Sequence, residues 1–117
     1  MKLAICTDVF ADLSYTDMLD KVKSLGIDAV EMTAGGLGAR KHCNTAELLA
    51  DAGKREAFMM ELEKRGMRIS ALNTSCNPLW PSKTGEEYKK SMYDCATLAG
   101  LLGVKKIVAM AGLPAGN

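Results

Sequence analysis

The sequence is poor in the residues that build metal and disulfide sites. It has one histidine, His42, and none of its four cysteines, Cys6, Cys43, Cys76 and Cys95, belongs to a CxxC pair. Zinc sites draw on several His or Cys ligands at close spacing, so we expect His42 to be a surface loop residue rather than a ligand. Widely spaced thiols favour a reduced chain, and we expect a cytoplasmic protein without disulfides.

Long hydrophobic runs and a charge excess are missing as well. The 117 residues are 48% apolar and 25% charged, and 15 basic against 14 acidic residues leave a formal charge of +1. No apolar run approaches the ~18 residues of a membrane span, and the N-terminus lacks the apolar stretch of a signal peptide. A nearly neutral chain produces no field that attracts a polyanion. We therefore expect neither a membrane nor a nucleic acid as partner.

What the sequence does contain is one pattern used three times. A polar residue opens an amphipathic run, a glycine closes it at Gly26, Gly66 or Gly103, and a short apolar segment follows. Spacings of about forty residues suit one strand, one loop and one helix per unit. The apolar segments are continuous, as in parallel strands covered on both faces, and lie at residues 3–7, 27–32, 67–72 and 104–109. The pattern predicts an α/β fold of parallel βα repeats with four strands and three helices.

Each predicted helix opens on a residue that can cap it. A Ser, Asn or Thr is followed three residues later by an acidic residue, in the pairs Ser14 with Asp17, Asn44 with Glu47, and Thr84 with Glu87. The second helical region runs to Arg65, and we expect a break at Gly53.

The length limits the architecture. A chain of 117 residues forms one domain with a real core, but it is about half of the ~250 residues of a closed eight-stranded βα barrel. No linker or charge block divides it, so we predict a single domain over residues 1–117. After the fourth strand we expect a glycine-proline loop at residues 111–117, where another helix would follow.

Carboxylates stand where a βα repeat places its chemistry, at the C-terminal ends of strands. Asp8 follows the first apolar segment, and Glu31 lies near the end of the second. Burying an unpaired carboxylate costs several kcal/mol, so Glu31 either faces a strand-end pocket or pairs with a Lys or Arg. If Ala29 and Glu31 point inward, Val30 and Met32 meet the helices, and we favour this arrangement.

A long polar loop follows the third apolar segment. Residues 72–81 contain Asn73, Asn77, two prolines and the only tryptophan, Trp80. Asparagine amides both donate to and accept from hydroxyls, and an indole face packs on the C–H face of a sugar ring. The loop therefore favours sugar recognition. The alternative is structural, because Asn and Pro are ordinary turn residues and Trp80 can fill a hydrophobic gap.

A glycine-rich segment, residues 35–41, ends on Arg40 and Lys41. Exposed backbone N–H groups followed by two cations favour a phosphate loop, although the glycine spacing matches neither the dinucleotide fingerprint nor a P-loop. A small α/β module that binds a phosphate or a nucleotide at this segment stays open as an alternative.

Four stretches of the chain resemble one known group of proteins. In order and spacing, residues 2–7, 25–31, 69–81 and 101–114 are similar to the N-terminal half of sugar phosphate isomerases/epimerases of the xylose isomerase-like TIM barrel superfamily. The resemblance covers essentially the whole chain. It implies half of a (βα)8 TIM barrel, truncated after the fourth strand.

The resemblance also implies an activity and a cofactor. A divalent metal, Mn, Mg, Co or Zn, assists proton transfer next to a sugar carbonyl in such enzymes, and related members are lyases. The implied metal ligands belong to later strands, so we expect this chain alone to bind no metal and to be inactive. We assign no catalytic residue.

A sugar or sugar-phosphate substrate is the expected ligand. The residues that we expect to contact it are Asp8, Glu31, Asn73, Asn77 and Trp80. A half barrel leaves its two outer strands unpaired, so we expect a homo-oligomer or a complementing C-terminal half as partner. A non-catalytic oligomerising subunit is the remaining alternative.

Overall fold

The computed structural model describes residues 1–38 and 40–112. Four parallel strands form one sheet in the order β1-β2-β3-β4. They are β1 (Ile5–Cys6), β2 (Ala29–Gly36), β3 (Arg68–Ser75) and β4 (Ile107–Ala109). Sequential order with parallel pairing is the topology of a (βα) barrel, and it places β1 and β4 at the outside of the described sheet.

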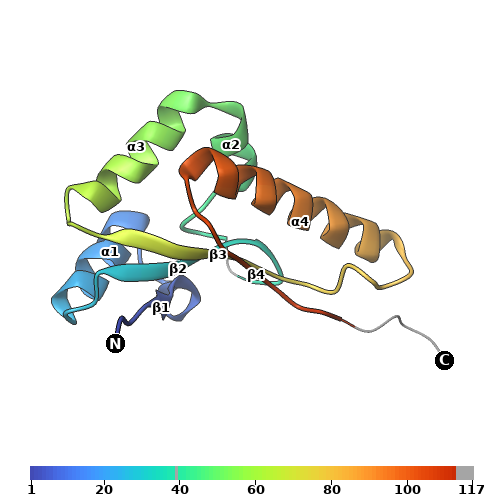
Figure 1. Cartoon of the computed structure of the whole chain (residues 1–117), viewed down its shortest axis with the longest axis horizontal. Helices are drawn as coiled ribbons and strands as arrows, with labels where there is room; N and C mark the ends of the chain where they lie inside the picture. Colours follow the sequence, from blue (N-terminus) through green and yellow to red (C-terminus); the bar gives the residue numbers. More distant parts are fainter. Residues whose placement is uncertain (39, 113–117) are drawn as a thin grey trace.

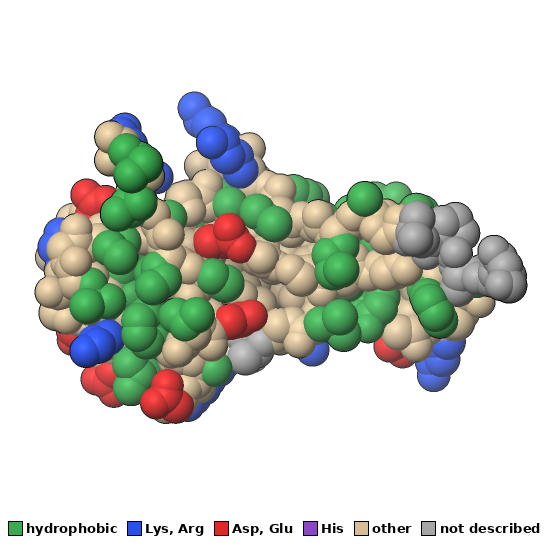
Figure 2. Space-filling view, turned by 90° about the horizontal axis from the view of Figure 1, so that it is seen from below, with side chains coloured by type: hydrophobic (Ala, Val, Ile, Leu, Met, Phe, Trp, Pro, Cys, Tyr) green, Lys and Arg blue, Asp and Glu red, His purple; other side chains and the backbone are tan. Residues whose placement is uncertain are grey.

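Helices alternate with the strands along the chain. A 3₁₀ turn, η1 (Thr7–Phe10), follows β1, and the α-helices are α1 (Tyr15–Ser24), α2 (Thr45–Ala50), α3 (Ala52–Glu63) and α4 (Lys83–Leu102). Helices α2, α3 and α4 lie together on one side of the sheet (Figure 1). The opposite face of the molecule carries scattered hydrophobic side chains with acidic side chains among them (Figure 2).

The hydrophobic core lies between the sheet and the helices. Val30 and Met32 of β2 and Leu72 of β3 are fully buried in it. Helix residues of the same cluster cover them, among which Met18, Leu19, Val22, Leu62 and Leu98 are fully buried. Ala29 and Glu31 do not belong to this cluster, which confirms the predicted division of β2 into a helix side and an inward side.

The three closing glycines end their helices as predicted. Gly26, Gly66 and Gly103 have φ values of +77°, +63° and +70°, a left-handed conformation that costs glycine little. The residue after each glycine then donates its N–H to the carbonyl five positions earlier: Ile27 to Val22, Met67 to Leu62, and Val104 to Ala99. Because this hydrogen bond still belongs to the end of the helix, β2, β3 and β4 each begin later than the apolar segments predicted.

The strand ends also differ from the prediction. β1 stops at Cys6 because the Thr7 hydroxyl accepts the N–H of Thr33 at 3.2 Å and the chain turns into η1. β2 and β3 continue to Gly36 and Ser75, past the apolar segments. Asn73 and Ser75 therefore belong to β3 rather than to the loop predicted at residues 72–81.

Two helix starts require correction. Ser82 caps α4, since its Oγ accepts the N–H of Gly85 at 3.4 Å, and Thr84 lies inside the helix. The backbone of Trp80 packs so closely on Gly85 that a Cβ there would lie 1.6 Å from the Trp80 oxygen. The second region breaks at Asp51 instead of Gly53, because Asp51 caps α3 through the Lys54 N–H at 3.0 Å.

The caps of α1 and α2 are confirmed. Ser14 accepts the N–H of Asp17, and Asn44 accepts that of Glu47, both at 3.2 Å. Because of the break at Asp51, the described residues form four α-helices where three were predicted. Most of the predicted glycine-proline loop, residues 113–117, lies outside the described residues.

The histidine is more buried than expected. His42 is only 4% exposed. Its Nε2 donates to the carbonyl of Leu13, in the loop before α1, at 3.0 Å, and this hydrogen bond holds the ring against that loop. The surface position predicted for it is wrong. Three of the four free thiols, those of Cys43, Cys76 and Cys95, are buried. Over residues 1–38 and 40–112, no helix has the length and apolar character needed to cross a membrane.

Candidate functional site

The inward face of β2 and β3 carries a chain of polar side chains. Asn73 donates from Nδ2 to Glu31 Oε1 at 2.5 Å, and Ser75 donates from Oγ to Asn73 Oδ1 at 2.6 Å. The strands bring these residues together because Thr33 and Asn73 are Cα partners in the parallel register. The three side chains alternate with the core residues of their strands. Asn73 and Ser75 lie in the C-terminal half of β3, where TIM barrels place their sites, but Glu31 is the third residue of β2 and does not stand near the strand end as predicted, because β2 continues to Gly36.

This chain fixes the orientation of the Asn73 amide. Its Oδ1 accepts the hydrogen bond of the Ser75 hydroxyl, so its NH₂ group faces Glu31. Within the described part of the chain, the second oxygen of Glu31, Oε2, has no hydrogen-bond partner and is available to a hydroxyl. Asn73 therefore acts on the site by positioning Glu31.

Asp8 lies at the same edge of the sheet, in η1 directly after β1. Its Oδ1 is buried and has no hydrogen-bond partner among the described residues. An unsatisfied buried acceptor costs about 1–3 kcal/mol, which a hydroxyl or N–H donor from a ligand would relieve. Asp8 is the described carboxylate with such an orphaned oxygen.

Gly38 closes over Asp8 from the loop that follows β2. A Cβ on Gly38 would lie 2.7 Å from Asp8 Oδ2 and 2.5 Å from Thr33 Cγ2. Only glycine permits this approach without displacing a neighbour. The loop after β2 therefore packs against Asp8 of η1 and against Thr33 of β2.

Asn77 and Trp80 occupy the turn between β3 and α4. Asn77 Oδ1 accepts the N–H of Leu79 at 3.1 Å, and the Asn77 carbonyl accepts that of Trp80 at 3.3 Å. The Trp80 side chain is 48% exposed, so it fills no gap in the core. The structure thus joins Glu31 to Asn73 by a hydrogen bond, places Asp8 against Gly38 after β1, and holds Asn77 and Trp80 in a separate turn.

The predicted phosphate loop is not formed as a glycine loop. Gly35 and Gly36 belong to β2, and Ser91 of α4 accepts the Gly36 N–H at 2.9 Å. A Cβ on Gly35 would lie 2.2 Å from Ser91 Oγ, so this glycine serves the close approach of α4 to the sheet. Arg40 and Lys41 lie beyond the strand, and Ala39 is outside the described residues.

The divalent metal implied by the resemblance does not fit these residues alone. Among the residues that the structure describes, no group of three or more His, Cys, Asp and Glu side chains is placed to hold a metal ion.

Sequence reasoning missed Ser75, Thr33 and Gly38. Thr33 stands two residues after Glu31, and Ser75 two residues after Asn73, so a strict period of two along longer strands would have placed both on the inward face. Gly38 had no local signal, because its role arises from contact with Asp8, 30 positions away in the chain.

Comparison with known proteins identifies a relative and a structural neighbour, whereas no family model matches the sequence. The chain is 47% identical over all 117 residues to the uncharacterized protein YfiH of Bacillus subtilis (strain 168), and it spans 37% of the length of that protein. The crystal structure of the probable 3-DHS dehydratase AsbF, involved in petrobactin synthesis, from Bacillus anthracis matches with a TM-score of 0.67 and 19% identity. That match covers 96% of this chain and 39% of AsbF.

The structural match confirms the fold prediction. AsbF is a TIM barrel, and this chain corresponds to a part of it with four parallel strands and their helices. The sequence identity is low, so the match concerns the fold and not the reaction.

Proposed function

We propose that this chain is the N-terminal half of a TIM-barrel enzyme that acts on a sugar or sugar phosphate, and that it supplies part of the substrate-binding surface. The observation that carries the proposal is the hydrogen-bonded series Glu31, Asn73 and Ser75 on the inward face of β2 and β3, together with the buried, unpartnered Oδ1 of Asp8 at the edge of the sheet where β1 ends. A ligand rich in hydroxyls suits this edge, because carboxylate oxygens accept hydroxyl hydrogen bonds. The fold shared with AsbF supports the placement of a site at this edge.

The residues have different roles in this proposal. Glu31 accepts a substrate hydroxyl with the oxygen that Asn73 leaves free, and Asn73 and Ser75 are positioning residues. Asp8 accepts a second hydroxyl with its orphaned Oδ1. Asn77 and Trp80 approach the same ligand from the turn before α4, where the exposed indole offers an apolar face.

Proton transfer next to a carbonyl is the reaction class that we propose for the whole protein. The resemblance favours an isomerase or epimerase that uses Mn, Mg, Co or Zn, with the metal ligands on later strands. The name of AsbF, a probable dehydratase, supports a lyase as the second candidate. The residues described here do not fit the metal by themselves, so their part is to bind and orient the substrate.

The partner that we propose is the remainder of a barrel. All three residues of β4 are exposed, and β1 and β4 are the outer strands of the described sheet. Unpaired strands bind further strands readily. The greater length of YfiH supports a complementing C-terminal half, and a second copy of this chain is the other candidate.

Turnover by the protein at its natural length tests the proposal. The protein is incubated in D₂O with a panel of aldoses, ketoses and their phosphates, and deuterium at the carbon next to the carbonyl is measured by NMR. Incorporation with isomerised product indicates an isomerase or epimerase, and an unsaturated product indicates a lyase. Absence of both exchange and product across the panel, with each metal added in turn, contradicts the proposal.

A pair of variants assigns the role of Glu31. Glu31→Gln is expected to lower kcat/KM about tenfold to hundredfold, since a charged hydrogen bond contributes about 1.5–3 kcal/mol. Glu63→Gln is the matched control, because Glu63 is exposed on α3 and its side chain has no hydrogen bond or ion pair within the described residues. Equal activity of the two variants would remove Glu31 from the site.

A further inference from the structure

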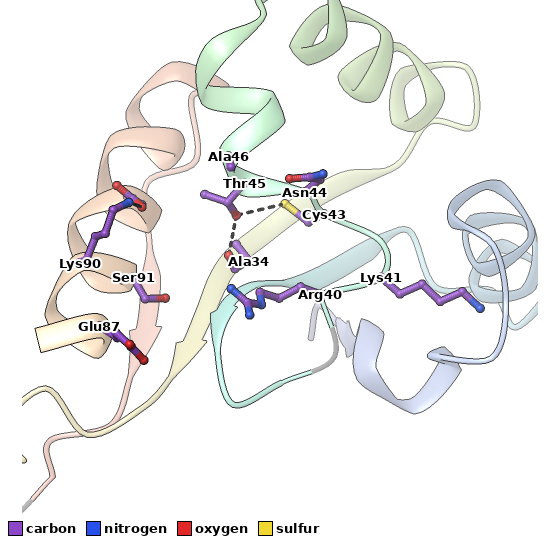
Figure 3. A pocket seen from close by; sticks show the side chains of 11 residues that line it. Ala34, Arg40, Lys41, Cys43, Asn44, Thr45, Ala46, Glu87, Lys90 and Ser91 are labelled. Atoms are coloured by element: carbon purple, nitrogen blue, oxygen red, sulfur yellow. Dashed lines mark hydrogen bonds and ion pairs between the residues drawn. The ribbon is translucent and has the colours of Figure 1, made fainter. Parts of the chain in front are cut away.

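A hollow lies on the helix side of the sheet. A cavity of about 460 Å³ opens between the segment after β2 and the first half of α4 (Figure 3). Its charged and amide-bearing lining residues are Arg40, Lys41 and Asn44 on one side, and Glu87, Lys90 and Asp94 on the other.

This cavity is separate from the strand-end site. Ala34, which lines it, belongs to the core cluster on the helix side of β2, whereas Glu31 lies on the opposite face of the same strand. A ligand in the cavity is therefore divided from Glu31 by the sheet.

Two of the three cations around the cavity already have partners. Lys90 forms an ion pair with Asp94 one turn further along α4. Lys41 donates from Nζ to the Asp12 carbonyl at 3.1 Å, and its side chain points away from the cavity in Figure 3. Both amines are thus occupied by the protein itself.

Arg40 is the cation that remains. Within the described part of the chain its side chain has no hydrogen bond and no ion pair, and Figure 3 shows its guanidinium directed across the cavity towards α4. The Asn44 amide adds a donor, because its Oδ1 accepts the Glu47 N–H and its Nδ2 stays available. A guanidinium presents parallel N–H groups that match the oxygens of a phosphate or carboxylate.

Glu87 adds a selective element. Its carboxylate also lacks an ion pair among the described residues, and it lines the cavity opposite Arg40. It repels a bare anion but accepts hydroxyls, so the pair favours a ligand that carries an anionic group and hydroxyl groups together.

We propose that the cavity between the segment after β2 and α4 is a second binding site, which takes a small phosphorylated polyol with its phosphate on Arg40 and Asn44 and its hydroxyls on Glu87. The site is independent of the function proposed for the strand ends.

Calorimetric titration of the protein at its natural length tests this site, with inorganic phosphate and glycerol phosphate as probes. Arg40→Gln is expected to weaken glycerol phosphate binding about tenfold or more, because a bidentate charged contact is lost. Arg68→Gln is the matched control, since Arg68 is an exposed arginine at the start of β3 and does not line this cavity. Glu87→Gln is expected to tighten inorganic phosphate severalfold and to weaken the preference for the ester.

The outcomes separate this proposal from the first one. Glu31→Gln is expected to lower turnover and to leave phosphate binding unchanged. Arg40→Gln is expected to weaken phosphate binding, so the two proposals are tested by different measurements on different variants. Equal affinity of the wild-type protein for both probes reduces the site to one for a free oxyanion and overturns the polyol assignment. No saturable binding of either probe, or equal binding by Arg40→Gln and Arg68→Gln, overturns the site.

Discussion

The two faces of β2 differ in the interactions that hold their side chains in place. On the helix side, Val30 and Met32 are fully buried in a cluster of apolar side chains from four helices. On the inward side, Glu31 is only half-buried and accepts a hydrogen bond from Asn73 of β3. The comparison shows that one strand can serve stability on one face and specificity on the other, because successive side chains point in opposite directions.

The largest expected effect falls on the apolar face. Leu72→Ala is expected to lower the free energy of unfolding by about 2–5 kcal/mol, because it opens a cavity under a fully buried side chain. Urea denaturation followed by circular dichroism measures the loss. Leu101→Ala, at a half-exposed position on α4, is the control and is expected to change little. A similar loss in both variants would contradict the location of the core.

The next effect falls on the inward face. Gly38→Ala is expected to lower the free energy of unfolding by about 1–3 kcal/mol and to reduce turnover, because the new Cβ collides with Asp8 and Thr33. Gly100→Ala is the matched control, since nothing lies within 4 Å of its Cβ position in α4, and the helix should gain up to about 1 kcal/mol. Unchanged turnover in Gly38→Ala would separate this contact from function.

A smaller change in stability is expected at Asn73. Asn73→Ala removes the donor to Glu31 and the acceptor for Ser75, which should cost about 1–2 kcal/mol of stability. Turnover should fall more than stability, because Glu31 loses its orientation. If the melting temperature falls and kcat/KM does not, the polar chain is structural.

The smallest expected effect concerns the reactivity of the cysteine thiols on the two sides of the sheet. Burial raises the pKa of Cys43 and of Cys95 from 9.0 to about 11, whereas Cys6 lies half-buried with its Sγ 3.8 Å from the Thr33 hydroxyl. We expect iodoacetamide to modify Cys6 first at pH 8, as measured by mass spectrometry of peptides. Modification of Cys6, Cys43 and Cys95 at the same rate would contradict the prediction that burial protects the thiols of Cys43 and Cys95.

The same thiols predict a pH dependence of stability. A thiol with a pKa raised by folding stabilises the native state fully below its unfolded pKa, near 9, and loses this contribution as the pH rises towards about 11. The free energy of unfolding should therefore fall between pH 9 and pH 11. In the double variant Cys43→Ala and Cys95→Ala, this part of the fall should disappear.

Much of the fold followed from local signals. Ser14 and Asn44 cap helices within four residues of themselves, and Gly26, Gly66 and Gly103 end helices by their own backbone conformation. Where the prediction of a helix start from the cap pattern was wrong, a contact outside that pattern determined the start. Ser82 caps α4 in place of Thr84 because the backbone of Trp80 packs against Gly85.

Less of the candidate site followed from the sequence. The inward direction of Glu31 was predictable from alternation, but its bond to Asn73 was not, because the register of β2 on β3 shifts between Val30 and Glu31 and again between Thr33 and Gly35. A one-residue shift changes which side chains meet.

The amino-acid sequence by itself determined the order of strands and helices, the three helix ends at Gly26, Gly66 and Gly103, and the side of β2 that carries Glu31. These depend on periodicity and on interactions within about five residues, which every copy of the repeat expresses alone. The tertiary structure decided the partners, since Glu31 meets Asn73 and Gly38 meets Asp8 only when the strands are aligned side by side. Contacts between residues 30 or 42 positions apart depend on the register and packing of the whole sheet, which local interactions do not specify.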